Sequence, residues 1–309
     1  ILSILVAYSI ACTVGLLVLR NEFILSFRRE YLWDAIRYSY PFIPHSFIAQ
    51  ASGDMDKFIL NRFIETAVVG IYQLGYSISY AIDILAHSVG RAFSPLFIQN
   101  VGGGSEQGKK DVLESTLSII FLFLAFGTAC SFFIPDFIIL FFQPEYHRST
   151  SILPLLVFAF VNSGLYYLFS NPLFFDVKLT KFVPVCTLTS GIVTVGLDFL
   201  LIPSLGMLGA AVAVFAGRFV LVIVASFFAS RSSLIKWPYK KTIFAYLVSV
   251  SFAVAVWLGS QTFSGISWFA VKAMLYLLSL GAVSLILWNS TFAFIILPMR
   301  ALNTIRRQV

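Results

Sequence analysis

The sequence has little charge, little cysteine and little histidine. Charged residues make up 11% of its 309 positions, whereas hydrophobic residues make up 59%, and the mean hydropathy is +0.91. Soluble domains carry about a quarter charged residues, so this chain lacks the charge needed to cover a surface in water. The composition therefore excludes an ordinary soluble domain and favours a membrane protein.

Cysteine and histidine are too few and too widely spaced to indicate a disulfide, a metal site or a catalytic centre. Cys12, Cys130 and Cys186 each fall inside a different apolar segment, which indicates neither a disulfide nor a metal site. The three histidines also stand on different segments, at His45, His87 and His147. No Ser-His-Asp order and no paired Cys/His spacing is present in the sequence. We therefore predict no metal, no cofactor and no enzyme activity.

Two short stretches imitate motifs of nucleotide chemistry. Residues 103–110 approach a phosphate-binding P-loop, but Lys110 replaces the Ser or Thr that binds Mg²⁺, and an apolar helix replaces the preceding strand. Asp54 and Asp56 imitate the acid pair of glycosyltransferases, but no soluble catalytic domain surrounds them. We interpret the acid pair as a helix start or a loop, and we expect neither stretch to bind a nucleotide.

Nine apolar segments predict an all-α fold, a polytopic bundle of transmembrane helices. A spanning helix needs about 20 mostly apolar residues. The candidate spans are residues 1–19, 38–52, 67–98, 115–135, 151–174, 183–203, 207–230, 243–259 and 268–297. The second is short unless its polar ends are counted. The third would be about 48 Å long as a helix, so it must tilt, kink or protrude from a hydrocarbon core of about 30 Å.

The basic residues predict the orientation of the bundle. Of the 21 lysines and arginines, fifteen fall in the first, third, fifth and seventh gaps and in the C-terminal tail, and three fall in the other gaps. Short cytoplasmic loops are enriched in Lys and Arg, so these gaps and the C-terminus are predicted to be cytoplasmic. The other three, Arg91, Arg218 and Lys272, lie within predicted helices, and we expect Lys272 to be an interfacial anchor. The net charge of +7 thus reflects topology and not nucleic-acid binding.

The first segment and the connection after it indicate how the chain is organised. The chain begins with Ile1 and is apolar at once, without the charged region or cleavage site of a signal peptide. The predicted orientation places Ile1 outside, so we expect at least one earlier span and an N-terminally truncated chain. In residues 20–37, the one long cytoplasmic connection, Phe23, Phe27 and Tyr31 recur every four residues. That spacing fits an amphipathic helix on the membrane surface, and a solvated connector is an equal alternative.

Ionisable residues inside the predicted helices are candidates for function, because a charge in hydrocarbon is costly and usually faces a partner or a wet cavity. Asp83, His87 and Arg91 follow one another at intervals of four residues, so they share one helix face on which neighbours can pair. Arg218 lies near the middle of segment 207–230, with apolar residues on both sides.

Two interpretations of these residues are open. Inward-facing arginines would make a cationic cavity suited to phosphate or an acidic sugar, and an aspartate would carry a coupling ion. Alternatively, the charges form internal ion pairs that fix helix packing, or the long side chain of Arg91 reaches the cytoplasmic interface. The substrate-cavity candidates are Arg91, Arg218, His87 and His45, and the ion-coupling candidates are Asp83 and Asp198.

Three stretches resemble polysaccharide flippases. In residues 53–72, an Asp precedes a short helix and then a Val-Gly-Ile-Tyr turn into the next span. Residues 200–211, Leu-Leu-Ile-Pro-Ser-Leu-Gly-Met-Leu-Gly-Ala-Ala, are similar to the joint between two late helices of that family. Residues 144–146 with 153–156 resemble its Tyr-containing outer loop. The chain thus resembles the multidrug/oligosaccharidyl-lipid/polysaccharide exporter superfamily and, within it, the O-antigen and capsule flippases.

This resemblance implies a domain organisation. Members usually have twelve or fourteen spans in two six-helix lobes. Residues 1–19 would be the last helix of a truncated N-terminal lobe, 20–37 a cytoplasmic amphipathic linker, 38–230 a six-helix C-terminal lobe, and 231–309 an extra helix pair with a cytoplasmic tail. Two residues depart from the family pattern: Asp198 stands where Asn is common, and Arg218 is a charge in a helix that varies between members.

The resemblance also implies a function. We expect an inner-membrane flippase that moves polyprenyl-pyrophosphate-linked oligosaccharide by alternating access, for lipopolysaccharide O-antigen, capsule or exopolysaccharide biosynthesis. Its partners would be the lipid-linked glycan, membrane lipids and a polysaccharide polymerase with chain-length machinery, and no nucleic acid. A multidrug exporter of the same fold, which would favour an acidic cavity, is the alternative. An integral-membrane polymerase or acyltransferase is the second alternative and would need larger outer loops.

Overall fold

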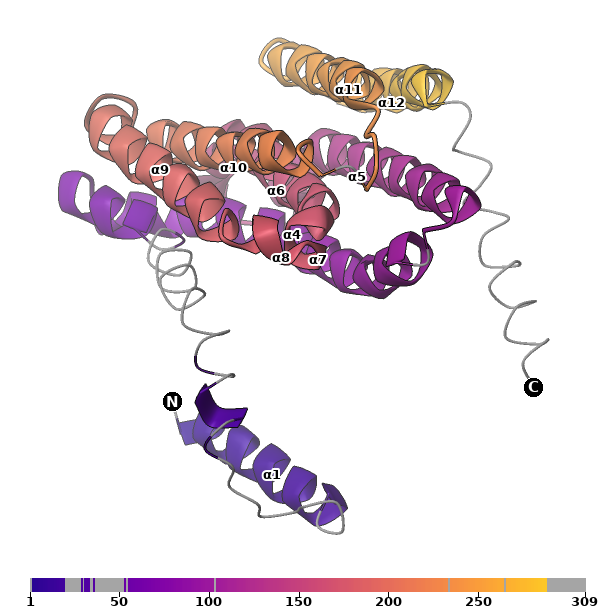
Figure 1. The fold of residues 1–309 in the computed structure, drawn as a ribbon. Coiled ribbons are helices and arrows are strands. Elements are labelled where there is room, and N and C mark those ends of the chain that lie inside the picture. The colour runs from indigo at the N-terminus through magenta and orange to yellow at the C-terminus, as the bar shows by residue number, and fades with distance from the viewer. Residues whose placement is uncertain are drawn as a thin grey trace. The chain divides into compact units, whose positions relative to one another are not determined.

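The computed structural model describes residues 2–19, 29, 31–33, 36, 53, 55–102, 104–232, 234–263 and 265–287, and in these ranges the regular structure is helical (Figure 1). The chain forms two units, residues 1–43 and 44–309, each of which we describe by itself. In the first unit, α1 (Leu2–Leu19) carries apolar residues on every side, as a helix in lipid does.

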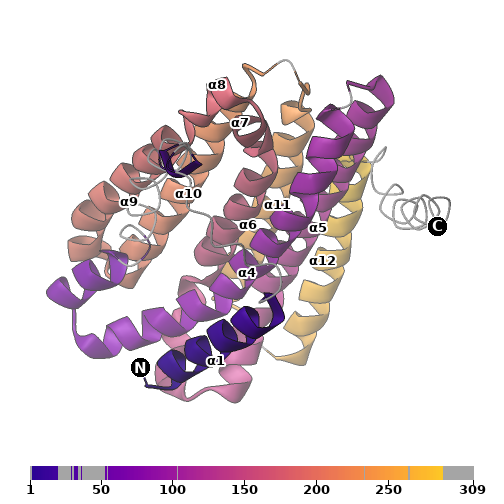
Figure 2. The same ribbon diagram turned by 60° about the horizontal axis from the view of Figure 1, so that its bottom comes forward.

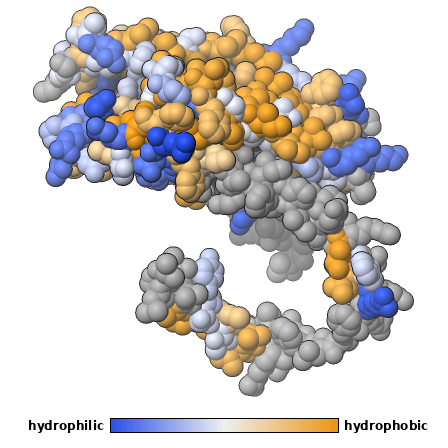
Figure 3. Space-filling model, turned by 90° about the vertical axis from the view of Figure 1, so that its left-hand side faces the viewer, coloured by the Kyte–Doolittle hydropathy of each residue, from blue (hydrophilic) through white to orange (hydrophobic). Residues whose placement is uncertain are grey.

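The second unit is a helical bundle that begins with a short helical segment at residues 55–63. The elements that follow are α4 (Thr66–Gly102), α5 (Glu106–Phe141), the 3₁₀ helix η1 (Pro144–Ser151), α6 (Leu153–Phe169), α7 (Asn171–Phe175), α8 (Val177–Thr180), α9 (Val183–Leu205), α10 (Met207–Ala229), α11 (Tyr239–Gly259) and α12 (Ile266–Ile286). Figure 3 shows apolar side chains across the middle of one face of this unit and hydrophilic ones toward its ends, as expected of a membrane-spanning bundle.

The predicted all-α, polytopic bundle is confirmed, but the count of nine spans is not. Six described helices are long and apolar enough to cross a membrane, or seven if η1 and α6, which meet at 54°, form one bent span. The predicted span 38–52, the linker 20–37 except for residues 29, 31–33 and 36, and the end of the span 268–297 lie outside the described residues.

Helix α6 lies at the centre of the second unit. It packs against α4, α5, α10 and α11, and nearly all of its side chains are buried (Figure 2). A helix that is apolar on all sides can be buried on all sides, which explains its central place. Its buried polar residues, Asn162 and Ser163, therefore stand deep in the bundle.

Helices α9 and α10 form a tight pair because small residues face each other. A Cβ atom added to Gly217 would overlap the side chain of Thr194, and the Ser190 hydroxyl donates a hydrogen bond of 2.8 Å to the Gly217 carbonyl. Small residues let membrane helices approach closely enough for such contacts. The turn between the two helices is Gly206, whose φ of +60° favours glycine.

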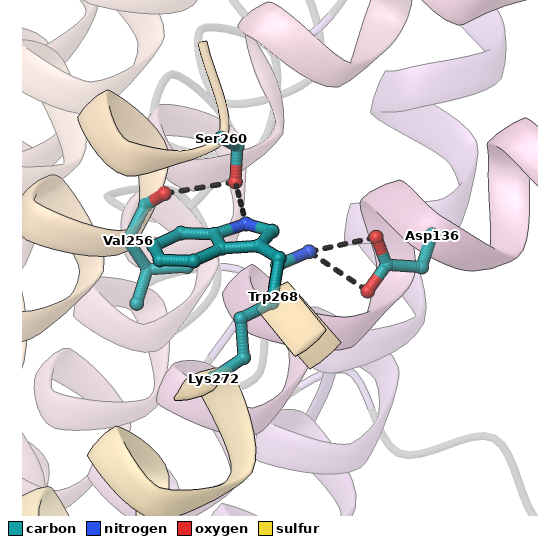
Figure 4. Close-up of polar contacts among 5 residues, drawn as sticks. All are labelled: Asp136, Val256, Ser260, Trp268 and Lys272. Atoms are coloured by element: carbon teal, nitrogen blue, oxygen red, sulfur yellow. Dashed lines mark hydrogen bonds and ion pairs between the residues drawn. The ribbon is translucent and has the colours of Figure 1, made fainter. Parts of the chain in front are cut away.

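Helix α12 is joined to α5 by a charged side chain, Lys272, whose place the sequence predicted wrongly. Lys272, expected at the membrane interface, is only 2% exposed. Its Nζ donates hydrogen bonds to both carboxylate oxygens of Asp136 on α5, at 2.7 and 2.8 Å (Figure 4). The interfacial-anchor prediction is wrong because the partner carboxylate, 136 positions away in sequence, satisfies the ammonium inside the bundle. Next to this ion pair, the Trp268 indole N–H donates to the Ser260 hydroxyl at 3.2 Å.

Candidate functional site

A cavity of about 810 Å³ lies among α4, α6, α7, α9 and α10, with the helical segment 55–63 at one end. Its lining residues are Gly53, Lys57, Gln73, Tyr76, Ser77, Tyr80, Asp83, His87, Gly90, Arg91, Ser94, Tyr166, Tyr167, Ser170, Asn171, Phe174, Thr187, Ser190, Gly191, Thr194, Val214, Arg218 and Leu221. Hydroxyl, amide and charged groups thus line a cavity inside a mostly apolar bundle.

One face of α4 forms a whole wall of the cavity. The lining positions recur every three or four residues from Gln73 to Ser94, which is the spacing of a single helix face. Gly90 lets this wall approach α6 closely, since a Cβ atom there would come 2.8 Å from Tyr167. Asp83, His87 and Arg91, predicted to share a face, all line the cavity.

Helix α6 positions Arg218 across the cavity. The guanidinium donates a 3.0 Å hydrogen bond to the Ser163 hydroxyl and lies 5.6 Å from the ring centre of Phe160. Within the described part of the chain, neither Arg218 nor Arg91 forms an ion pair. Both arginines therefore keep their charge available to an anion in the cavity.

The middle of the cavity holds a carboxylate and a ring cluster. Asp83 is 8% exposed, and its buried Oδ1 has no hydrogen-bond partner among the described groups. His87 packs edge-on against Tyr167, with ring centres 5.2 Å apart. Asp83, His87 and Arg91 are all described, and no hydrogen bond or ion pair joins them, so the pairing that their spacing allows is not formed. Tyr167 instead lies within electrostatic range of Asp83, Arg91 and Arg218.

Of the two remaining site candidates, one lies away from the cavity wall and the other is outside the described residues. Asp198 on α9 is fully buried, is absent from the cavity wall, and has no hydrogen-bond partner for either carboxylate oxygen in the described ranges. It lies within electrostatic range of Asp56, a buried residue that accepts hydrogen bonds from the Lys57 amide and the Tyr72 hydroxyl. His45 falls outside the described residues. In the ranges searched, no group of three or more His, Cys, Asp or Glu residues is placed to hold a metal ion.

Sequence reasoning missed several lining residues. The three-to-four-residue spacing, continued back from Asp83, would have found Tyr80, Ser77 and Gln73 on the same face of α4. Tyr167 and Lys57 had no such signal, because only tertiary packing brings their segments to the cavity.

The stretch that imitates a P-loop is the start of a helix. Ser105 precedes α5, and its hydroxyl accepts a 3.0 Å hydrogen bond from the Gly108 amide, which is an ordinary N-cap. Lys109 pairs with Glu106 at 2.7 Å, one turn away.

Comparison with known proteins gives a family match and a fold match. Residues 1–101 match the profile of a family described as "Polysaccharide biosynthesis protein". The structure described as "Lipid II flippase MurJ, inward closed conformation" aligns with a TM-score of 0.61 and 17% identity, over 87% of this chain and 57% of that chain. The chain thus spans a little more than half the length of that flippase. No curated protein matches the sequence.

These findings establish different things. At 17% identity, the likeness to the solved flippase shows a common fold of the aligned helices. The family match covers the part of the sequence that includes Asp83, His87 and Arg91, and it ends before α6 and α10. The predicted resemblance is thus supported by a polysaccharide biosynthesis family match over residues 1–101 and by a fold shared with a solved flippase.

Proposed function

We propose that the chain is part of a membrane flippase that carries a lipid-linked glycan across the bilayer. The observation that carries this proposal is the charge of the cavity: among the described lining residues, Lys57, Arg91 and Arg218 stand against one carboxylate, Asp83. An excess of cations inside a membrane bundle suits an anionic cargo. The family match and the flippase fold support the same reading.

The cargo would be a polyprenyl-pyrophosphate-linked oligosaccharide. Its pyrophosphate, or an acidic sugar, would be held by Arg91 and Arg218, because guanidinium groups bind phosphate and carboxylate oxygens with strong, charge-assisted hydrogen bonds. Sugar hydroxyls cannot enter hydrocarbon without losing hydrogen bonds, so the glycan needs a polar path while the polyprenyl tail stays in lipid. The whole protein would work by alternating access in a bacterial inner membrane, with a cytoplasmic C-terminus, in O-antigen, capsule or exopolysaccharide biosynthesis.

A coupling ion would bind at Asp198 or Asp83. Both carry a buried carboxylate oxygen without a hydrogen-bond partner in the described part of the chain, and a bare buried carboxylate is costly unless a cation or a proton accompanies it. If Na⁺ binds there, adding NaCl in place of choline chloride will raise the unfolding temperature of the wild type. The gain should disappear in Asp198→Asn or in Asp83→Asn, whichever residue holds the ion. An equal rise in unfolding temperature in the wild type and in both variants would rule out ion binding at these residues.

The two alternatives have less support. A multidrug exporter for organic cations would favour an acidic cavity, and this one is predominantly cationic. A membrane polymerase or acyltransferase would need a catalytic site in its loops. The described loops are short: Gly206 alone joins α9 to α10, and residues 260–265 join α11 to α12.

The test is complementation of a bacterial strain that lacks its own flippase. The open reading frame that encodes this chain is expressed as wild type, as Arg91→Ala and as Arg218→Ala, at equal levels. We expect the wild type to restore surface glycan and to clear the lipid-linked oligosaccharide that accumulates on the cytoplasmic face, and both variants to fail. Arg148→Ala, an exposed arginine of η1 away from the cavity, is the matched control and should complement.

Two outcomes would change the proposal. Complementation by all variants would keep the flippase and make the arginines structural. Failure of the wild type with several unrelated glycans, together with resistance to cationic drugs, would favour the exporter.

A further inference from the structure

One part of the cavity is aromatic, unlike the part that holds the arginines, and Lys57 borders it with its Nζ 4.4 Å from the ring centre of Tyr76. Tyr80 on α4 is 42% exposed and stacks on Tyr76, with ring centres 6.1 Å apart and planes 14° from parallel. Phe160 on α6 meets both rings edge-on, at 5.6 Å from Tyr80 and 5.4 Å from Tyr76. Tyr76 and Phe160 are buried, so they hold the Tyr80 ring in place while part of its surface stays open.

Uncharged polar groups border this ring on the same helix face. Ser77 and Gln73, one and two turns before Tyr80, are exposed and joined by a 3.0 Å hydrogen bond. A face with an exposed amide and hydroxyl is a poor surface for lipid, because their remaining hydrogen-bonding groups would be unsatisfied there. Both residues line the cavity, so their partners would come from water or from a ligand.

A rigid aromatic ring beside amide and hydroxyl groups fits the chemistry of a pyranose sugar. One face of a pyranose presents C–H groups that pack on an aromatic ring, and its edge presents hydroxyls that donate and accept hydrogen bonds. A phosphate does not stack in this way, and a lipid tail does not use the polar border. The arrangement therefore points to a sugar ring.

We propose that Tyr80, Gln73 and Ser77 form a saccharide subsite for the sugar that is attached directly to the lipid pyrophosphate. This subsite rests on the flippase function proposed above. Its position follows from Phe160, on which Arg218 and Tyr80 both pack, at 5.6 Å in each case. Because one ring separates the anion-binding guanidinium from the sugar-binding ring, a phosphate and its adjoining sugar can occupy both at once.

The experiment compares lipids with and without a sugar. The full chain in lipid nanodiscs is titrated with polyprenyl pyrophosphate, and with the same lipid carrying one N-acetylglucosamine or one galactose. We expect the wild type to bind at least one sugar-bearing lipid more tightly than the bare lipid. Tyr80→Ala should weaken that binding about tenfold and leave the bare lipid unchanged, since a lost aromatic contact is worth roughly 1 kcal/mol or a little more.

Three matched variants separate stacking, hydrogen bonding and folding. Tyr80→Phe keeps the ring and should bind like the wild type, whereas Gln73→Ala should weaken only the sugar-bearing lipid, by about threefold to tenfold for one lost hydrogen bond. Arg218→Ala should weaken the bare and the sugar-bearing lipid by similar factors. Each variant is used only if its unfolding temperature matches that of the wild type.

The outcomes distinguish the subsite from the function it depends on. If the wild type binds all three lipids equally, or if Tyr80→Ala weakens the bare lipid as much as the others, the saccharide subsite is wrong and the flippase proposal stands. If the wild type binds none of the lipids, the proposed function itself fails.

Discussion

Two regions of the bundle hold cations among helices, and they treat them in opposite ways. Where α12 meets α5, Lys272 is buried and paired with Asp136 through two hydrogen bonds. In the cavity, Arg91 and Arg218 face open space, and neither has a carboxylate partner among the described residues. A buried charge that has an ion-pair partner is explained by helix packing alone. An unpaired buried charge is stable only with water or a ligand beside it. The charges of the cavity therefore need water or a ligand beside them, and the α5–α12 contact needs neither.

The largest effect should come from removing both cavity arginines. The double variant Arg91→Ala/Arg218→Ala should bind polyprenyl pyrophosphate about 100-fold more weakly, because hydrogen bonds to charged groups are worth about 1.5–3 kcal/mol each. Its unfolding temperature should change little, because the variant loses one hydrogen bond, between Arg218 and Ser163, and neither arginine has a carboxylate partner among the described residues. Titration in nanodiscs beside a thermal scan measures both. A marked drop in stability without a change in affinity would make these arginines structural and abolish the contrast between the two regions.

The opposite result is expected at the α5–α12 contact. Lys272→Met leaves Asp136 without its cation, which should cost about 2 kcal/mol of unfolding free energy, below the 3–5 kcal/mol of fully buried pairs because Asp136 is 36% exposed. Lipid affinity should not change. The double variant Lys272→Met/Asp136→Leu is the control, and it should recover most of the lost stability. If Lys272→Met alone impaired lipid binding with normal stability, this ion pair would belong to the transport site.

A smaller effect is expected from the hydrogen bond that holds Arg218. Ser163→Ala removes the 3.0 Å contact to the guanidinium, and one such bond is worth about 1 kcal/mol. Affinity for polyprenyl pyrophosphate should fall about fivefold, with little change in unfolding temperature. Ser163→Thr keeps the hydroxyl and should stay near the wild type. An unchanged affinity in Ser163→Ala would show that Phe160 packing alone positions Arg218.

The smallest effect should come from the hydrogen bond beside the ion pair. Trp268→Phe loses the donor to Ser260 and part of the contact with α11, which should cost about 1 kcal/mol of stability. Lipid affinity should match the wild type, as measured in the same titration. Reduced affinity here would mean that the contact region and the cavity are coupled.

Hydropathy predicted most spans closely and failed where polar residues lie inside helices. The segments 183–203, 207–230 and 243–259 agree with α9, α10 and α11 to within a few residues, because apolar length alone sets those boundaries. Helix α5 begins nine residues before the predicted start at 115, at Glu106, since its first turns are amphipathic and capped by Ser105. The predicted segment 151–174 is divided among α6, α7 and the end of η1.

The candidate site could likewise be predicted only in part. The face shared by Asp83, His87 and Arg91 could be predicted, because helical spacing alone brings those residues to one side. The partners of Arg218 and Lys272, Ser163 and Asp136, could not, because they come from other helices whose register no single sequence reveals. A charge in a predicted helix was therefore visible, but whether it was paired was not.

The close fit of Gly217 against Thr194 has a mechanical consequence. Helices α9 and α10 are hydrogen-bonded through the Ser190 hydroxyl and joined at Gly206, so they should move as one rigid unit. Helices α4 and α9 both line the cavity with little direct packing between them, so a change in their separation would break few contacts. If the cargo is a glycan, we expect adaptation to a glycan of different size to occur by substitutions on the cavity face of α4. The small residues between α9 and α10 should stay the same.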